Sequence, residues 1–261
     1  AVRLTEPHNV LEQPVESHLP ALTRLTPDMA AFELCEDVRE LMLISYQVLR
    51  DHPVNQARVA RGALPANLIW PWGAATAMNL DSFAQKYGHS GSVISAVPLV
   101  WGIAALGGLK TPHVPGANGD LDTNCEGKVG AALQALLTDG DDFAAVHVEA
   151  PDEMAHAGSL EKKMQAIRMV NDRVVEPLLN RLTESGEPFR LLLLSDHPTL
   201  LTTRTHDGSP VPYAIYDSRD AARAASDNKP APTRKFCEKT ANDAPLLNDG
   251  TQLMNLLFAE E

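Results

Sequence analysis

Two short apolar runs, each followed within a few residues by acidic and imidazole side chains, constrain the fold of this sequence most. Residues 143–149 read FAAVHVE and residues 190–194 read RLLLL. Nearly continuous apolar runs of this length are typical of strands that helices cover on both faces. Helical apolar spacing follows the first run at 160–182. The alternation predicts an α/β fold, a mostly parallel sheet covered by helices, in which these two strands are parallel neighbours.

The rest of the chain continues this alternation. Its apolar spacing predicts further strands at 92–97 and 211–216, and further helices at 28–50, 99–106, 128–137 and 250–258. Residues 217–234, rich in Ala, Asp, Arg and Pro, are expected to form a surface loop. In open α/β sheets, ligands bind at the carboxyl ends of the strands. The polar residues that follow positions 149 and 194 therefore mark the expected site.

Charge and cysteine content narrow the classes of function. The chain has 22 Lys and Arg against 34 Asp and Glu, a net charge of -12 and a pI near 5.2. Such an acidic surface repels nucleic acids and anionic lipids, so neither is expected as a partner. The three cysteines are far apart, and no apolar run approaches the roughly 20 residues of a membrane span. These features favour a reduced, cytoplasmic setting.

The first polar cluster is Asp152 with His156. A spacing of four residues places both side chains on the same face of one helical turn. A carboxylate and an imidazole together suit zinc, manganese or another divalent first-row metal. Taken alone, such a pair is more often a helix-capping aspartate with an unrelated surface histidine.

Asp196 and His197 directly follow the second apolar run, and His206 lies in the loop beyond them. An Asp-His-Pro sequence also suits an ordinary turn, and a lone loop histidine is usually solvated. The three clusters occur in order between residues 152 and 206, however, and two of them follow predicted strands. We therefore interpret them together as a metal-binding site.

The longer strings around these residues resemble a known family. VHVEAPDEMAHAG, LLLSDHPTLLTTRTH and SPVPYAIY resemble the archaeal-type branch of the cofactor-independent phosphoglycerate mutases, in the alkaline-phosphatase superfamily. PANLIWPWG, VPGANGDLDTN and HPVNQARVARG agree with this. The resemblance implies the C-terminal portion of such an enzyme. Residues 61–261 would form the alkaline-phosphatase-like catalytic domain without its N-terminal segment, and residues 1–60 part of a smaller inserted α/β domain and linker.

The resemblance also implies a cofactor and its ligands. Members of the family hold the phosphoryl group with two divalent ions; manganese is expected here, with magnesium or zinc as alternatives. Asp152, His156 and His206 would bind one ion, and Asp196 and His197 the other. His156 Nε2 and His206 Nε2 should then lie within about 5 Å of each other, because metal–nitrogen bonds are about 2.0–2.1 Å long.

Cationic and polar residues are implied on the side of the substrate, a small phosphorylated metabolite. Lys128 and Arg58 correspond to catalytic cations that contact the phosphate, where arginine gives bidentate oxyanion contacts. The substrate-binding residues implied by the motifs are Arg61, Asn55, Asn67 and Asp122.

The implied reaction interconverts 3-phosphoglycerate and 2-phosphoglycerate through a phosphoserine. The metal-binding aspartate and the nucleophilic serine of the family's N-terminal segment have no counterpart in this sequence. We therefore expect that segment either in a longer polypeptide, of which this chain is a fragment, or as the separate partner of a split protein, and we expect the isolated chain to be inactive. Alternative interpretations are a metal-dependent phosphatase, a homoserine-kinase-like phosphotransferase of the same superfamily, and a catalytically silent metal-binding fragment.

Overall fold

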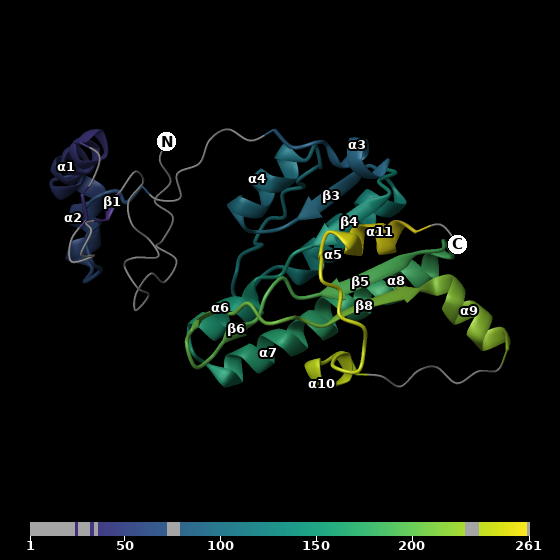
Figure 1. Cartoon of the computed structure of the whole chain (residues 1–261). Helices are drawn as coiled ribbons and strands as arrows, with labels where there is room; N and C mark the ends of the chain where they lie inside the picture. Colours follow the sequence, from purple (N-terminus) through teal and green to yellow (C-terminus); the bar gives the residue numbers. More distant parts are fainter. Residues whose placement is uncertain (1–23, 26–31, 34–35, 72–78, 228–234, 260–261) are drawn as a thin grey trace. The chain divides into compact units, whose positions relative to one another are not determined.

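The computed structural model describes residues 24–25, 32–33, 36–71, 79–227 and 235–259. The chain divides into two compact units, residues 1–78 and 79–261 (Figure 1). The observed division at residue 78 lies beyond residue 60, where the sequence placed the end of the inserted domain. The assignment of the two parts to an inserted and a catalytic domain stays a prediction.

The first unit contains a short hairpin and two helices. Strands β1 (Arg24–Leu25) and β2 (Phe32–Glu33) are antiparallel, and helices α1 (Glu36–Arg50) and α2 (Pro53–Ala60) follow. The prediction of one helix over 28–50 is wrong at its start, because residues 32–33 pair with β1. The helix begins at Glu36, where Glu36 and Asp37 interact favourably with the positive end of the helix dipole.

The second unit alternates strands and helices, as the apolar pattern predicted. Its elements are α3 (Phe83–Tyr87), β3 (Gly91–Ile94), α4 (Pro98–Leu106), α5 (Cys125–Leu137), β4 (Phe143–Val146), α6 (Ala150–His156), α7 (Leu160–Val170), the π-helical turn η2 (Asn171–Val175), α8 (Glu176–Ser185), β5 (Arg190–Leu194), β6 (Thr199–Leu200), β7 (Thr205–His206), β8 (Tyr213–Asp217), α9 (Ser218–Ser226), α10 (Glu238–Ala241) and α11 (Gln252–Phe258). The helix expected at 160–182 is the α7–η2–α8 segment. The α/β fold class is confirmed.

The surface loop predicted for 217–234 is wrong at residues 218–226, which form α9. Two local features explain the helix. Alanine has the highest intrinsic helix propensity, and SRDAARAAS is rich in it. The Asp217 carboxylate accepts a hydrogen bond from Arg219 N at 2.9 Å, which satisfies one of the free N–H groups of the first turn.

Strand pairing differs from the expected order. β3 and β4 are parallel, and Ile94 lies opposite Val146; β5 pairs with β8 in antiparallel fashion. The expectation that the strands ending at Glu149 and Leu194 are parallel neighbours, or nearly so, in one sheet is wrong, because β4 and β5 belong to separate two-stranded sheets. The helices α6 to α8 between β4 and β5 are long enough for a parallel crossover, but β5 instead pairs with β8, to which the chain returns after the β6–β7 hairpin.

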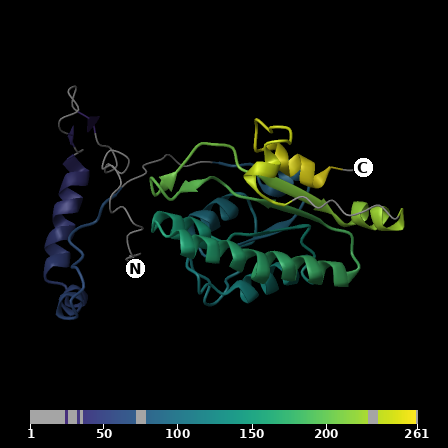
Figure 2. The ribbon, with the colours of Figure 1, turned by 90° about the horizontal axis from the view of Figure 1, so that it is seen from below.

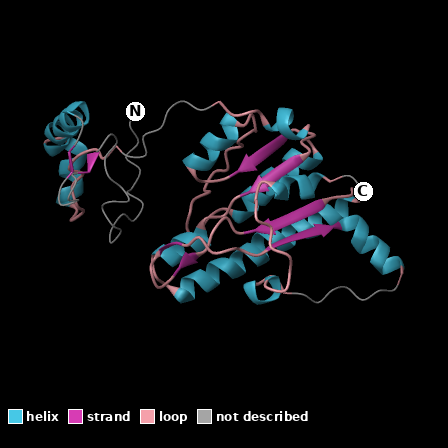
Figure 3. Ribbon diagram, viewed as in Figure 1, coloured by secondary structure: helices cyan, strands magenta, loops and turns pink. Residues whose placement is uncertain are grey.

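Helices lie on both sides of the strands. Figure 2 shows β5 and β8 between α11 on one side and the α7–α8 segment on the other, and Figure 3 shows the same layers by element type. Phe258 of α11 packs its ring against Phe83 and Phe143, with centroids 5.9 and 6.0 Å apart. Within the described residues, every helix is too short or too polar to cross a membrane.

The main hydrophobic core lies between α5, the α7–α8 segment and the carboxyl ends of β3 and β4. Its most deeply buried members are Ile94, Cys125, Ala150 and Ala166, all fully buried. Because α6 begins at Ala150, this core fixes the helix that carries the first pair of predicted metal ligands.

Candidate metal centre

Helix α6 presents Asp152 and His156 together. Ala150, Met154 and Ala155 are buried, so their positions orient the helix. Asp152 Oδ2 lies 3.2 Å from His156 Nε2, and both side chains are partly buried. The prediction that the four-residue spacing places the two side chains on one face is confirmed.

The β6–β7 hairpin brings the third ligand to this pair. Thr199 lies opposite His206, and Arg204 ends the turn in the left-handed backbone region, with φ of 54°. This conformation is uncommon for a residue other than glycine. The carbonyl oxygen of Arg204 accepts a hydrogen bond from His156 Nδ1 at 2.8 Å. The turn therefore both places His206 and fixes the ring orientation of His156.

The facing nitrogens of His156 and His206 fit a shared ion. Because Nδ1 of His156 donates to a carbonyl, its Nε2 carries a free lone pair in the neutral ring. That atom lies 3.1 Å from His206 Nε2, inside the expected 5 Å. Asp152 completes a group whose ligand atoms all lie within 4.8 Å of one another. Two imidazoles and a carboxylate at these separations suit a divalent first-row metal.

The electrostatic surroundings keep His206 in its metal-binding form. Burial is the largest cause that lowers its pKa, and His197 and His156 lower the pKa further, while Asp152 acts in the opposite direction. A lower pKa favours the neutral imidazole, the form that coordinates metals.

Asp196 and His197 follow β5 directly and adjoin this cluster. His197 Nε2 lies 3.1 Å from Asp196 Oδ2, so the two offer a pair of ligand atoms. The His197 ring stacks on the His206 ring, with centroids 3.8 Å apart and planes at 30°. All five residues predicted as metal ligands are thus brought together. That the Asp196–His197 pair holds a second ion stays a prediction.

The sequence analysis missed Thr199, which connects the two ligand groups. Its side chain is buried, with a relative exposure of 5 % for the residue. The hydroxyl hydrogen-bonds Asp152 Oδ1 and lies 3.3 Å from His197 Nδ1. Its position two residues after His197 gave no signal in the sequence, because His197 lies in a bend and the alternation rule for strands does not apply there.

Lys128 is fully buried on α5, and Nζ donates to the backbone carbonyl of His147 at 2.9 Å. Burial lowers the pKa of Lys128. His147 Nδ1 lies 3.1 Å from Ser95 Oγ; burial lowers the pKa of His147, and Asp196 and Asp152 act in the opposite direction. Lys128 therefore places a buried amino group next to His147. Its contact with a substrate phosphate stays a prediction.

The other residues predicted for catalysis or substrate binding are divided between the two units. Asp122 of the second unit accepts a hydrogen bond from Asn118 Nδ2 at 2.9 Å. Four belong to the first unit: Asn55, Arg58, Arg61 and Asn67. Asn55 is buried, and its amide exchanges two hydrogen bonds with the backbone of Ala66, at 2.9 and 2.7 Å. This pairing gives Asn55 a structural function within its unit, and the substrate roles of all five residues stay predictions.

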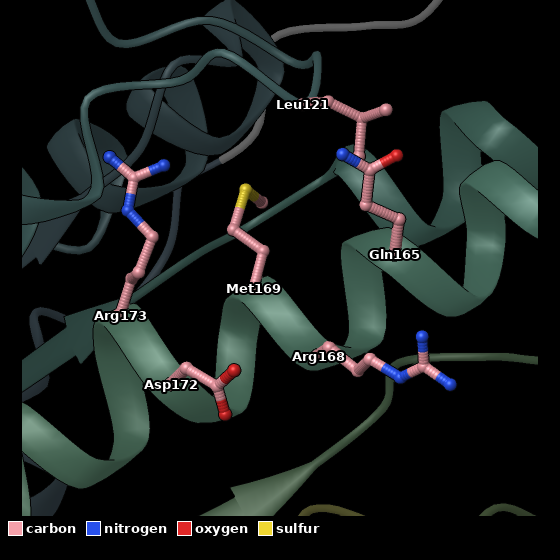
Figure 4. A pocket seen from close by; sticks show the side chains of 6 residues that line it. All are labelled: Leu121, Gln165, Arg168, Met169, Asp172 and Arg173. Atoms are coloured by element: carbon pink, nitrogen blue, oxygen red, sulfur yellow. The ribbon is translucent and has the colours of Figure 1, made fainter.

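A pocket of about 260 Å³ lies apart from these ligands, along α7 and η2 (Figure 4). Its lining side chains are Leu121, Gln165, Arg168, Met169, Asp172 and Arg173. The Arg173 guanidinium forms two hydrogen bonds to the Glu126 carboxylate, at 2.9 and 2.8 Å. In Figure 4 the Arg168 side chain points away from Met169 at the pocket's centre. None of the predicted metal ligands lines this pocket.

The chain is similar to a known family and to several known proteins. Residues 12–248 match the metalloenzyme superfamily. The 2,3-bisphosphoglycerate-independent phosphoglycerate mutase of Methanothrix thermoacetophila is 44% identical over 82% of this chain and 52% of its own length. The enzyme of that name from Methanosarcina acetivorans is 50% identical over 70% of this chain and 45% of its own length. The solved structure of the PH0037 protein from Pyrococcus horikoshii has 28% identity and a TM-score of 0.59, over 70% of this chain and 47% of that one. The chain spans about half the length of the curated relatives it matches.

Proposed function

This chain belongs to the metalloenzyme superfamily, and from that premise we propose that it forms the metal-binding part of a cofactor-independent phosphoglycerate mutase. The proposed reaction interconverts 3-phosphoglycerate and 2-phosphoglycerate in cytoplasmic glycolysis and gluconeogenesis. The observation that carries the proposal is the cluster of Asp152, His156 and His206, continuous with His197. Relatives that bear the mutase name, at 44% and 50% identity, support the choice of substrate.

Asp152, His156 and His206 would hold one divalent ion, and Asp196 with His197 would supply part of a second site. Manganese is the proposed metal, because the carboxylates of Asp152 and Asp196 are ligands that suit it. When bound, such ions polarise phosphoryl oxygens and lower the pKa of an attacking hydroxyl group. The Arg204 carbonyl holds the His156 ring so that Nε2 faces the site.

The charges of the site explain why a phosphate ester needs these ions. Asp152 and Asp196 place two carboxylates where the substrate would bind, on a chain of net charge -12. Like charges repel, so the carboxylates alone would exclude a phosphorylated metabolite. Lys128 adds a buried amino group beside His147. Metal binding would therefore convert an anion-repelling surface into an anion-binding one.

Phosphorus NMR of 3-phosphoglycerate tests the proposed reaction. We propose that the serine nucleophile lies outside these 261 residues, so the chain is assayed alone and after fusion to the N-terminal part of the Methanothrix relative. With Mn²⁺, the fusion should form 2-phosphoglycerate without free phosphate, and EDTA should stop the reaction. Release of inorganic phosphate would indicate a phosphatase instead. Turnover by the chain alone would show that the nucleophile lies within it.

A further inference from the structure

We propose that Thr199 is a positioning residue that couples the two groups of metal ligands through one continuous hydrogen-bonded path, from Asp152 to His197. The path begins at Asp152 Oδ1, passes through the Thr199 hydroxyl and reaches His197 Nδ1 at 3.3 Å. The inference rests on the metal sites of the proposed function, but it does not depend on the identity of the substrate.

The donors and acceptors on this path fix its direction. An ionised carboxylate only accepts hydrogen bonds, so the Thr199 hydroxyl donates a hydrogen bond to Asp152. The hydroxyl oxygen can then only accept from His197, which requires a proton on Nδ1 of that ring. When Nε2 of a histidine coordinates a metal, the ring proton lies on Nδ1 and is usually held by a carboxylate, carbonyl or water. Thr199 Oγ1 supplies that acceptor for His197.

Thr199 is itself held rigidly. The residue is buried, and its carbonyl oxygen accepts a hydrogen bond from Lys163 Nζ at 2.7 Å. In the β6–β7 ladder its partner is His206, a ligand of the first group. Thr199 therefore joins three segments by its own contacts: α6 through Asp152, the chain after β5 through His197, and β7 through His206.

Two substitutions of Thr199 in the full chain distinguish the effect of its hydroxyl group from the effect of its packing. Thr199→Val keeps the branched shape and removes the hydrogen bonds, whereas Thr199→Ser keeps the hydroxyl. Loss of a residue that orients metal ligands typically weakens metal affinity by about 10–100-fold. We expect a loss of that size for Thr199→Val in Mn²⁺ calorimetry, and most of the affinity to remain in Thr199→Ser. Thr203→Val, at an exposed position of the same hairpin, is the matched control and should bind Mn²⁺ like the unmodified chain.

Nitrogen NMR shows which ring nitrogen of His197 carries the proton, a property that a change in packing alone would not alter. In the Zn²⁺-loaded unmodified chain, the His197 ring proton should be on Nδ1, and metal-free Thr199→Val should lose that preference. A proton on Nε2 in the loaded chain would overturn the inference, even if Thr199→Val does not fold. Equal Mn²⁺ affinities of Thr199→Val and the unmodified chain would overturn it too and leave the metal sites standing. Absence of Mn²⁺ binding by the unmodified chain would overturn both.

Discussion

At the scale of single residues, the His156 ring is held from two sides, because a carbonyl fixes one ring nitrogen and a second imidazole faces the other. Replacement by alanine removes a ligand. Loss of a residue that only orients a ligand lowers metal affinity by up to about 100-fold, so we expect His156→Ala to lower Mn²⁺ affinity by at least that much. Titration calorimetry measures the change. His113→Ala, at an exposed position, is the control and should leave the affinity unchanged.

Residues of the site differ in how far the sequence reveals them. Asp152 and His156 could be predicted because both lie on one helical turn, a relation that spacing alone defines. Asp196 and His197 could be predicted because they follow an apolar strand. Thr199 could not be assigned a function from its position, because that function depends on a partner 47 residues away in the chain. Only the folded arrangement of α6 against the hairpin creates the contact.

At the scale of elements, the turn after α6 and the turn of the hairpin depend on each other. Gly158 has φ of +71°, and a Cβ added there would lie 2.6 Å from Arg204 Nε. We expect Gly158→Ala to cost about 1–2 kcal/mol of unfolding free energy, from the left-handed backbone alone. It should also weaken Mn²⁺ binding, because Arg204 orients His156.

Urea denaturation measures this cost, and a second glycine gives a control of opposite sign. Gly102 lies inside α4 with open space around its Cα, so Gly102→Ala should stabilise the chain by about 0.5–1 kcal/mol. If Gly158→Ala were as stable as the unmodified chain, the left-handed backbone at residue 158 would not carry the expected cost.

A second element-scale prediction concerns the end of the β5–β8 ladder. Asp217 accepts hydrogen bonds from Arg219 and Arg190, each at 2.7 Å, and these guanidinium groups hold the pKa of Asp217 well below its usual range. A carboxylate with a lowered folded-state pKa adds stability above its unfolded pKa of about 3.9, and this contribution is lost as the pH falls toward the folded value. Asp217→Asn should therefore destabilise the chain at pH 7 by about 1–3 kcal/mol.

The same substitution should cost progressively less as the pH falls below about 4. Urea unfolding at pH 7 and pH 3 compares the two conditions. Asp220→Asn, which removes an exposed pair with Arg223, serves as the control and should have little effect at either pH. A difference between Asp217→Asn and the unmodified chain that does not change with pH would contradict the assignment.

Elements also differ in how well the sequence predicts them. The bounds of β5 match the apolar run at 190–194, because a nearly continuous run of this length shows no helical spacing. Its partner could not be predicted, since pairing depends on where the chain returns after the hairpin. Helix α9 was mistaken for a loop because its charged and small residues resemble loop composition, although alanine and the Asp217 cap favour a helix.

At the scale of the whole molecule, metal binding should stabilise one unit and not the other. All five predicted ligands lie in residues 79–261. A ligand that binds only the folded state, at 100 times its dissociation constant, adds about 2.7 kcal/mol. For a domain of this size that corresponds to a rise in melting temperature of about 5–10 °C.

Calorimetric unfolding with and without Mn²⁺ measures the rise, and EDTA should reverse it. A transition that belongs to residues 1–78 should not move, which provides an internal control. His156→Ala should remove the effect of Mn²⁺ on the second unit. A shift of equal size in that variant would place the stabilising ion elsewhere.

The β6–β7 hairpin has a kinetic consequence. Each of its strands contributes two residues to the ladder, and the backbone bonds Arg204 N to Leu200 O and Asp207 N to Pro198 O complete it. So small a paired segment opens at low free-energy cost, compared with the core helices. Opening would carry His206 away from α6 while Asp152 and His156 stay in place. The amide hydrogens of Arg204 and Asp207 should therefore exchange with solvent faster than those of α5. The rate of their exchange would set the longest time for which an ion can stay bound.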